Sequence, residues 1–184
     1  MATIVDSYSE ANYDADANLQ VVHPSAVTNT SISGQSFTGD GQKIGSCKFY
    51  LKKEGSPGAM AALLYSHTGT FGVSSLPHTH LATSNTYEAT DVLGTDFALF
   101  ELKGFVGYTL VNGTKYCILL RAMSGTWDAS NRVILGRDTS SPTHGGNYIY
   151  FTLGTYKYYA PHNLCFYVLG VVPAVGRSIG LVMG

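Results

Sequence analysis

Residues 44–53 alternate between apolar and polar side chains, which is the pattern of a β-strand with one buried face. The apolar positions are Cys47, Phe49 and Leu51, and the polar positions between them are Lys48, Tyr50 and Lys52. Pro57 and Gly58 follow shortly afterwards and predict a turn. The sequence therefore predicts a strand over 44–53 that presents one face to a core.

Similar apolar or alternating runs recur along the chain, separated by Gly, Pro, Asn and Asp. The further predicted strands cover 32–39, 59–67, 81–89, 95–104, 108–120, 132–138, 147–153 and 164–172. Asn112 and Gly113 stand between two apolar runs and predict a tight hairpin turn, whereas residues 69–80 are predicted to form a long loop. About ten short strands, with no convincing amphipathic helix, predict an all-β antiparallel sandwich of the jelly-roll type.

The two ends of the chain differ in character from its middle. Residues 1–32 are polar and acidic and are predicted to form an N-terminal arm, with one strand near 19–23. The sandwich domain is predicted over 33–163. Residues 164–184 are almost wholly apolar. They are expected to form either the last strands of the sandwich or an arm that contacts another subunit, since exposed apolar segments often mark interfaces.

Charge is scarce in this sequence, since only 12% of residues are charged and the net charge is −1. Nucleic-acid binding is not expected, because it needs clustered Lys and Arg, and Lys52–Lys53 is the longest basic feature. Membrane insertion is not expected either, because no apolar run approaches about 18 residues. The first residues show no basic stretch before an apolar block, so no secretory signal is predicted.

Candidate metal ligands and thiols are few. Cys47, Cys117 and Cys165 lie in separate apolar runs without a CxxC pair, so buried free thiols are expected, with one disulfide as the alternative. His78 and His80 would share a face of a strand and could hold a metal, but they fall in the predicted loop. Asp14 and Asp16 have the spacing of a calcium loop but lack its Gly and Glu. No cofactor is predicted, with structural calcium as the alternative.

Catalytic motifs are absent from the sequence. It contains no GxSxG elbow and no HExxH helix, and no pair of carboxylates stands out as a glycosidase acid and nucleophile. The run Gly39–Gly45 lacks the Ser or Thr and the helix of a phosphate loop. The chain is therefore predicted not to be an enzyme, and no catalytic residue is assigned.

Aromatic residues are the remaining candidates for a binding surface. Trp127 falls in a polar stretch, and Tyr156, Tyr158 and Tyr159 form a cluster. An exposed aromatic face can stack on a sugar ring, and tyrosine at high density also suits protein interfaces. The alternative for all four residues is ordinary core packing or sheet surface.

Several motifs, taken in order, are similar to a β-sandwich module of bacteriophage structural proteins, which is related to modules of bacterial and archaeal surface proteins. These motifs are GQSFTGDGQKIGSCKFYLKKEGSPG, LLYSHTGTFG, LATS, YTLVNGTKYCILL and RDTSSPTHGGNYIY. The similarity covers roughly residues 33–153. It implies a jelly-roll fold and a place on the particle, and it supplies no catalytic residues.

The function predicted from the resemblance is that of a virion structural protein, as capsid decoration, tail or fibre component. Its expected partners are copies of itself and other virion proteins, after assembly in the host cytoplasm and release. The low charge and the apolar C-terminal segment agree with self-assembly. The alternative is a carbohydrate-binding or adhesive module at a cell surface, with surface glycans as partners.

Overall fold

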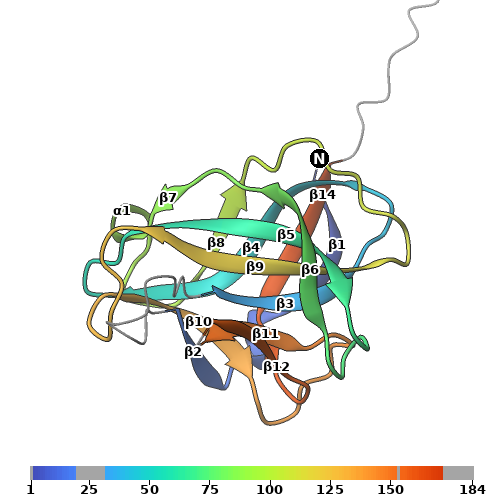
Figure 1. Ribbon diagram of the computed structural model, residues 1–184. Helices are drawn as coiled ribbons and strands as arrows, with labels where there is room; N and C mark the ends of the chain where they lie inside the picture. Colours follow the sequence, from blue (N-terminus) through green and yellow to red (C-terminus); the bar gives the residue numbers. More distant parts are fainter. Residues whose placement is uncertain (1, 20–31, 153, 172–184) are drawn as a thin grey trace, which may run out of the picture.

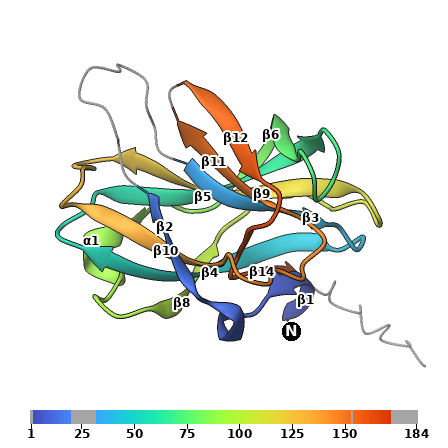
Figure 2. The same ribbon diagram turned by 90° about the horizontal axis from the view of Figure 1, so that it is seen from below.

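The computed structural model describes residues 2–19, 32–152 and 154–171. These residues form two antiparallel seven-stranded sheets, called sheet A and sheet B, which pack face to face (Figures 1 and 2). Sheet A contains β1 (Ala2–Tyr8), β2 (Ala15–Leu19), β4 (Lys43–Glu54), β8 (Ala98–Lys103), β10 (Arg132–Asp138), β13 (Asn163–Leu164) and β14 (Phe166–Val171). Sheet B contains β3 (Ile32–Thr38), β5 (Ala59–Thr68), β6 (Leu76–Thr83), β7 (Tyr87–Glu88), β9 (Lys115–Ser124), β11 (Tyr148–Thr152) and β12 (Thr155–Tyr159). A 3-10 turn, η1 (Glu10–Asn12), and a short helix, α1 (Ala89–Val92), lie between strands.

The strand order within the sandwich is that of a jelly roll. In sheet A the neighbours run β2–β10–β4–β8, and in sheet B they run β3–β9–β5–β6. The chain crosses from one sheet to the other at β2–β3–β4–β5 and again at β8–β9–β10. Such alternation is the double Greek key of jelly rolls. The predicted all-β antiparallel sandwich of jelly-roll type is confirmed.

Two additions extend this eight-strand frame. The β11–β12 hairpin continues sheet B beyond β3. In sheet A, β14 and β10 share one edge of β4: β14 pairs with residues 43–49 and β10 with residues 51–54. β1 in turn pairs with β14. Cys165 lies between β4 and β10: its backbone N–H donates to the Gly136 carbonyl, and its carbonyl accepts from the backbone N–H of Tyr50. The segment 163–171 therefore fills a split between β4 and β10.

The main core lies between the sheets and is built from alternating strand positions. In β4, Cys47, Phe49 and Leu51 are buried, and the predicted alternation of this strand is confirmed. Phe37, Ile118 and Phe166 join them from β3, β9 and β14. The apolar run that follows the predicted turn at Asn112 and Gly113 belongs to β9, a central strand between β3 and β5.

The ends of the chain differ from the prediction. Residues 2–8 and 15–19, expected in an arm, form β1 and β2 of sheet A, because their partners β14 and β10 present free edges to them. Residues 166–171 form a strand with neighbours on both sides, which agrees with the core alternative for this segment. Residues 20–23 and 172–184 lie outside the described residues.

Two local predictions also differ. Asn112 and Gly113 form a turn, with φ of +76° at Gly113, but it does not join two paired strands. The segment before the turn contacts sheet A, where Thr109 forms a bridge with Lys43, whereas β9 after the turn belongs to sheet B and pairs with β3 and β5. Residues 76–80, predicted within a long loop, begin β6, so His78 and His80 lie in a strand.

Cys47, Cys117 and Cys165 are buried and free, which confirms the predicted thiols. In the part of the chain that the structure describes, no helix has the length and apolar character needed to cross a membrane.

Candidate ligand pocket

Trp127 does not offer the exposed face that a sugar platform needs. Its side chain is only 8% exposed and belongs to the main core. Its indole N–H donates to the Ser124 carbonyl at 2.9 Å, so its polar edge is occupied by the chain itself. For Trp127 the structure agrees with the alternative of core packing, because a large apolar ring with one donor is more stable when it is buried and hydrogen-bonded.

The predicted tyrosine cluster is divided between the two faces of the β11–β12 hairpin. Successive side chains of a strand alternate, so Tyr156 and Tyr158 share one face and Tyr159 lies on the other. Tyr158 and Tyr159 are similarly exposed, at 45% and 46%. Gly154, with φ of +77°, lies between the paired Thr152 and Thr155 and favours this tight connection.

A pocket of about 330 Å³ opens between the hairpin and the β2–β10 edge of sheet A. We call it the tyrosine–arginine pocket, and its lining residues are Asp16, Ala17, Asn18, Arg137, Tyr148, Tyr150, Tyr159 and His162. Figure 2 shows β2 and β10 on one side of the sandwich and β11 and β12 on the other. The volume falls in the range of small-molecule sites, about 300–1,000 Å³.

Four aromatic rings form a continuous stack along this pocket. Tyr148 and Tyr150 lie with centroids 5.6 Å apart, Tyr150 and Tyr159 5.7 Å apart, and Tyr159 and His162 4.8 Å apart. The interplanar angles are 12°, 21° and 8°, so the rings are nearly parallel. Burial and the neighbouring Tyr159 raise the pKa of Tyr150, so its hydroxyl stays protonated and can donate a hydrogen bond.

Arg137 supplies the cation of the pocket. Its guanidinium carbon lies 5.6 Å from the centroid of the Tyr148 ring, and its Nη1 donates to Nδ1 of His162 at 3.2 Å. A guanidinium has only donors, so Nδ1 is the acceptor and the neutral ring carries its hydrogen on Nε2. Burial, and then the charge of Arg137, lower the pKa of His162, which keeps the ring neutral.

Sequence reasoning found Tyr159 but missed the rest of the pocket. Arg137 comes from β10, which was predicted only as a strand over 132–138, and His162 lies directly before β13. The rings of Tyr148 and Tyr150 lie two residues apart and were assigned only to a strand. The alternation of Tyr148 and Tyr150 was the available signal, since it places two aromatic rings on one face.

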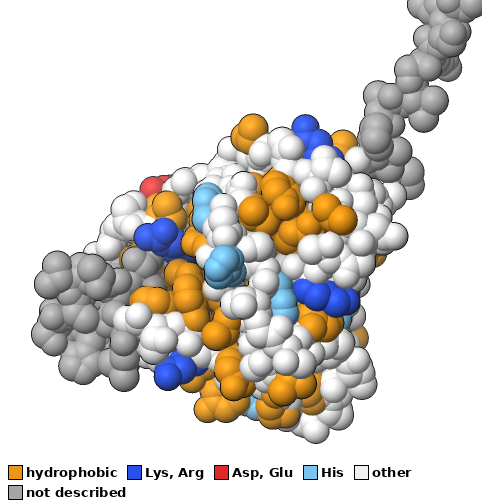
Figure 3. Space-filling view, turned by 45° about the vertical axis from the view of Figure 1, so that its right-hand side comes forward, with side chains coloured by type: hydrophobic (Ala, Val, Ile, Leu, Met, Phe, Trp, Pro, Cys, Tyr) orange, Lys and Arg blue, Asp and Glu red, His pale blue; other side chains and the backbone are white. Residues whose placement is uncertain are grey.

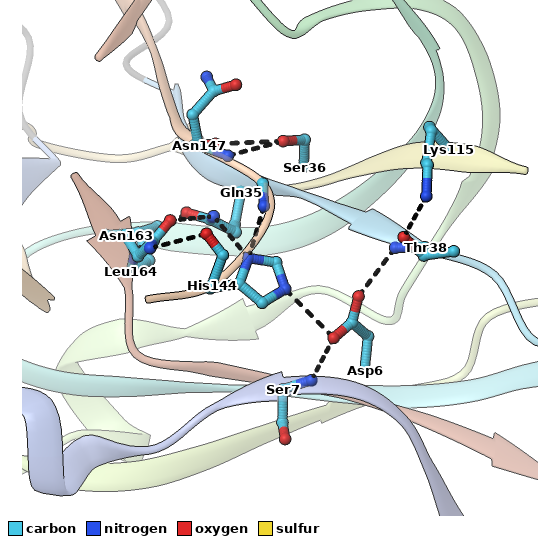
Figure 4. A network of polar contacts seen from close by, with 11 residues as sticks. Asp6, Ser7, Gln35, Ser36, Thr38, Lys115, His144, Asn147, Asn163 and Leu164 are labelled. Atoms are coloured by element: carbon cyan, nitrogen blue, oxygen red, sulfur yellow. Dashed lines mark hydrogen bonds and ion pairs between the residues drawn. The ribbon is translucent and has the colours of Figure 1, made fainter. Parts of the chain in front are cut away.

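A second polar cluster joins β1, β3, β13 and the loop after β10 (Figure 4). His144 Nε2 lies 3.1 Å from Asp6 Oδ1, while Gly146 N and Gln35 Nε2 lie 3.1 Å and 3.2 Å from His144 Nδ1. Since Gly146 N can only donate, Nδ1 accepts and Nε2 donates to Asp6. Both ring nitrogens are therefore engaged by the protein, which indicates a structural role for His144.

The outer face of sheet B carries the other tyrosines. Ile32, Leu63, Cys117, Leu119 and Ile149 form a buried cluster on it, and Tyr65, Phe151 and Tyr156 pack against that cluster. Burial, and then the neighbouring Tyr65, raise the pKa of Tyr156, so its hydroxyl stays protonated. Figure 3 shows a face on which apolar, histidine and other neutral side chains surround a few Lys or Arg side chains, and very little Asp or Glu is visible.

The residues predicted as candidate metal ligands have hydrogen-bond partners within the chain. Across residues 2–19, 32–152 and 154–171, no three His, Cys, Asp or Glu side chains group as a metal site. Asp14 accepts hydrogen bonds from Thr139 N and Ser140 N. His78 Nδ1 lies 3.0 Å from its neighbour Thr79 Oγ1, and His80 Nε2 lies 2.8 Å from Thr83 Oγ1.

Comparisons with known proteins assign the chain to no family. No family model matches the chain, and no curated protein matches it. Among solved structures, it is similar to one of the cysteine protease and lectin-like domains of Cwp84, a surface layer associated protein of Clostridium difficile. The identity is 12% and the TM-score 0.49, over 77% of this chain and 32% of that one. The similarity to bacteriophage modules stays a prediction.

Proposed function

We propose that this chain is a carbohydrate-binding module that holds sugar rings in the tyrosine–arginine pocket. The observation that carries the proposal is the parallel stack of Tyr150, Tyr159 and His162 at an open pocket. The C–H groups of a sugar ring pack on such aromatic faces, and its hydroxyls need a few well-placed polar partners. Arg137, Asn18 and the tyrosine hydroxyls supply such partners here.

The composition of the pocket favours binding over cleavage. A glycosidase of the usual kind needs two carboxylic side chains on opposite sides of the scissile bond. Asp16 is the one carboxylate among the described lining residues, and Tyr13 and Lys52 already contact it. We therefore propose adhesion without catalysis.

The proposed activity leaves the biological setting open to both earlier predictions. A module of this kind suits a cell surface, where glycans are abundant. It suits equally a virion that attaches to such a surface, which is the setting implied by the resemblance. In either setting the tyrosine–arginine pocket is the contact site, and self-association is not required for binding.

A glycan array followed by titration calorimetry tests the proposal. The informative variant is Tyr159→Ala, which shortens the ring stack at its exposed end. The matched control is Tyr158→Ala, which removes an equally exposed ring from the opposite face of the same strand. We expect Tyr159→Ala to weaken glycan binding about tenfold or more, as for aromatic anchors, and Tyr158→Ala to leave it unchanged.

Two results would overturn this proposal. One is the absence of binding to any glycan by the folded wild-type chain. The other is loss of binding in Tyr158→Ala but not in Tyr159→Ala, which would place the site on the outer face of sheet B. Circular dichroism of each variant confirms that the comparison is made between folded proteins.

A further inference from the structure

Arg137 occupies an inward-facing position of β10. Leu135 and Val133, which are two and four residues earlier on the same strand face, lie in the main core. The same face therefore changes from aliphatic to cationic where the two sheets open toward the pocket. A charge at such a position is expensive to leave unpaired, because it is partly removed from water.

The guanidinium of Arg137 has no compensating carboxylate in the described part of the chain. The ion pairs in that part of the chain involve Lys52, Lys103 and Arg132, and none involves Arg137. Its Nε is buried and has no hydrogen-bond partner among these residues. Its described contacts are the face of Tyr148 and the neutral ring of His162.

The carboxylates near the pocket are held by other groups. Asp16 accepts from the Tyr13 hydroxyl at 2.7 Å and lies 3.8 Å from Lys52 Nζ. Asp14 accepts from the Thr139 and Ser140 amides. Asp138 accepts from the hydroxyl of Tyr8 and from amides of the loop after β10. The pocket thus contains the positive charge of Arg137, while the carboxylate among its described lining residues, Asp16, is engaged by Tyr13 and Lys52.

We infer that the tyrosine–arginine pocket selects sugars that carry a carboxylate, such as uronic acid residues. This inference rests on the proposed function and adds the chemical class of the ligand. Arginine matches a carboxylate in charge and in planar geometry, and the attraction is strong in a partly desolvated site. The aromatic stack binds the ring of the sugar while Arg137 binds its acidic group.

A matched pair of ligands separates the inference from the proposal that it extends. Calorimetry is done with an oligogalacturonate and with its carboxyl-reduced counterpart, an oligogalactoside of equal length. The variants are Arg137→Gln and, as a control for net charge, Lys43→Gln, which removes an exposed cation from the start of β4. We expect a wild-type preference of about tenfold or more for the acidic ligand, lost in Arg137→Gln and kept in Lys43→Gln.

The outcomes are distinguishable. Equal binding of both ligands overturns the inference and leaves the proposed function standing. If the wild-type chain binds neither of the two ligands nor any arrayed glycan, both are overturned. A preference that survives Arg137→Gln also overturns the inference. If Arg137→Gln is unfolded by circular dichroism, Arg137→Lys decides: a smaller preference supports the inference, because lysine keeps the charge without the planar fork, and an unchanged preference overturns it.

Discussion

Nε2 of His144 lies 3.1 Å from Oδ1 of Asp6, and this contact joins residues that are 138 positions apart. Asp6 also accepts from Ser7 N and Thr38 N at 2.8 Å each, so its carboxylate links β1 to β3 as well (Figure 4). Through Gln35 the same network reaches Asn163 and Leu164 N. The network therefore connects β1 of sheet A to β3 of sheet B and to β13, the segment that precedes β14.

Asp6→Asn should lower the free energy of unfolding by about 1–3 kcal/mol, because the new amide group would face at least one backbone N–H as donor against donor. Urea denaturation at neutral pH measures the change. Glu88→Gln, which removes an exposed carboxylate from β7, is the matched control and should change stability by no more than about 0.5 kcal/mol. Equal effects of the two substitutions would show that the network contributes nothing.

The contribution of Asp6 should vanish in acid. Burial alone would raise the pKa of Asp6, but hydrogen bonds from His144, Thr38 and Ser7 outweigh it and hold the pKa below 3.8. A lowered folded pKa stabilises the protein fully above the unfolded value and loses that effect as pH falls through the folded value. The stability difference between wild type and Asp6→Asn should thus shrink below about pH 4. A constant difference from pH 7 to pH 2 would contradict this.

Residues 164–171 should be required for folding. A chain ended after Asn163 loses β14, which leaves β1 without a partner and opens the split between β4 and β10. We expect it to lack a cooperative thermal transition by circular dichroism. The control is a chain ended after Val171, which keeps every described strand. A cooperative transition in the shorter chain would contradict the core role of β14.

The three thiols should not react in the native protein. Burial raises the pKa of Cys165 to about 12 and raises the pKa of Cys47 and Cys117 further, and a protonated buried thiol is a poor nucleophile. With a thiol-specific aromatic disulfide at pH 8, we expect no fast reaction until denaturant exposes all three. A fast native reaction that disappears in Cys165→Ser would show that the split between β4 and β10 opens.

Tyr13 should lose its hydroxyl proton only at unusually high pH. Its hydroxyl donates to Asp16 at 2.7 Å, and this hydrogen bond, with burial and the charge of Asp16, raises the pKa of Tyr13 to about 12. An Asp16→Asn variant should bring the pKa back toward 10, because the carboxylate acceptor is gone. The carbon shift of the Tyr13 ring, followed by NMR against pH, measures it. Asp91→Asn serves as the control, and an unchanged Tyr13 in Asp16→Asn would contradict the assignment.

The interior strands were predictable because their signal is local. Residues 44–53 alternate because one face of the strand is buried and the other is exposed to solvent. The run at the end of 108–120 is apolar throughout because β9 is buried on both faces, with Ile118 in the main core and Leu119 in the outer cluster. The first strand was missed for the opposite reason. Residues 2–8 are half polar, and only β14, far away in the sequence, makes them a strand.

The candidate site was less predictable than the fold. Tyr156, Tyr158 and Tyr159 looked like one cluster, but the period of two divides them between faces once β12 pairs with β11. For Trp127 the polar neighbours in the sequence left a binding surface and core packing as alternatives, and its ring is buried. Arg137 and His162 meet because β13, which directly follows His162, pairs with the end of β10, and no spacing in the sequence reveals this pairing.

The pairing of Ala2 with Val171 also sets a schedule for folding during synthesis. At roughly 5–20 residues per second, β1 waits on the order of ten seconds or more for its partner strand to be made. Until then the edge of β4 that receives β14 has no cover, and the Asp6 carboxylate also waits for most of this time until His144 has been made. Contacts this distant along the chain slow folding, so the nascent protein depends on a period of protection from its neighbours.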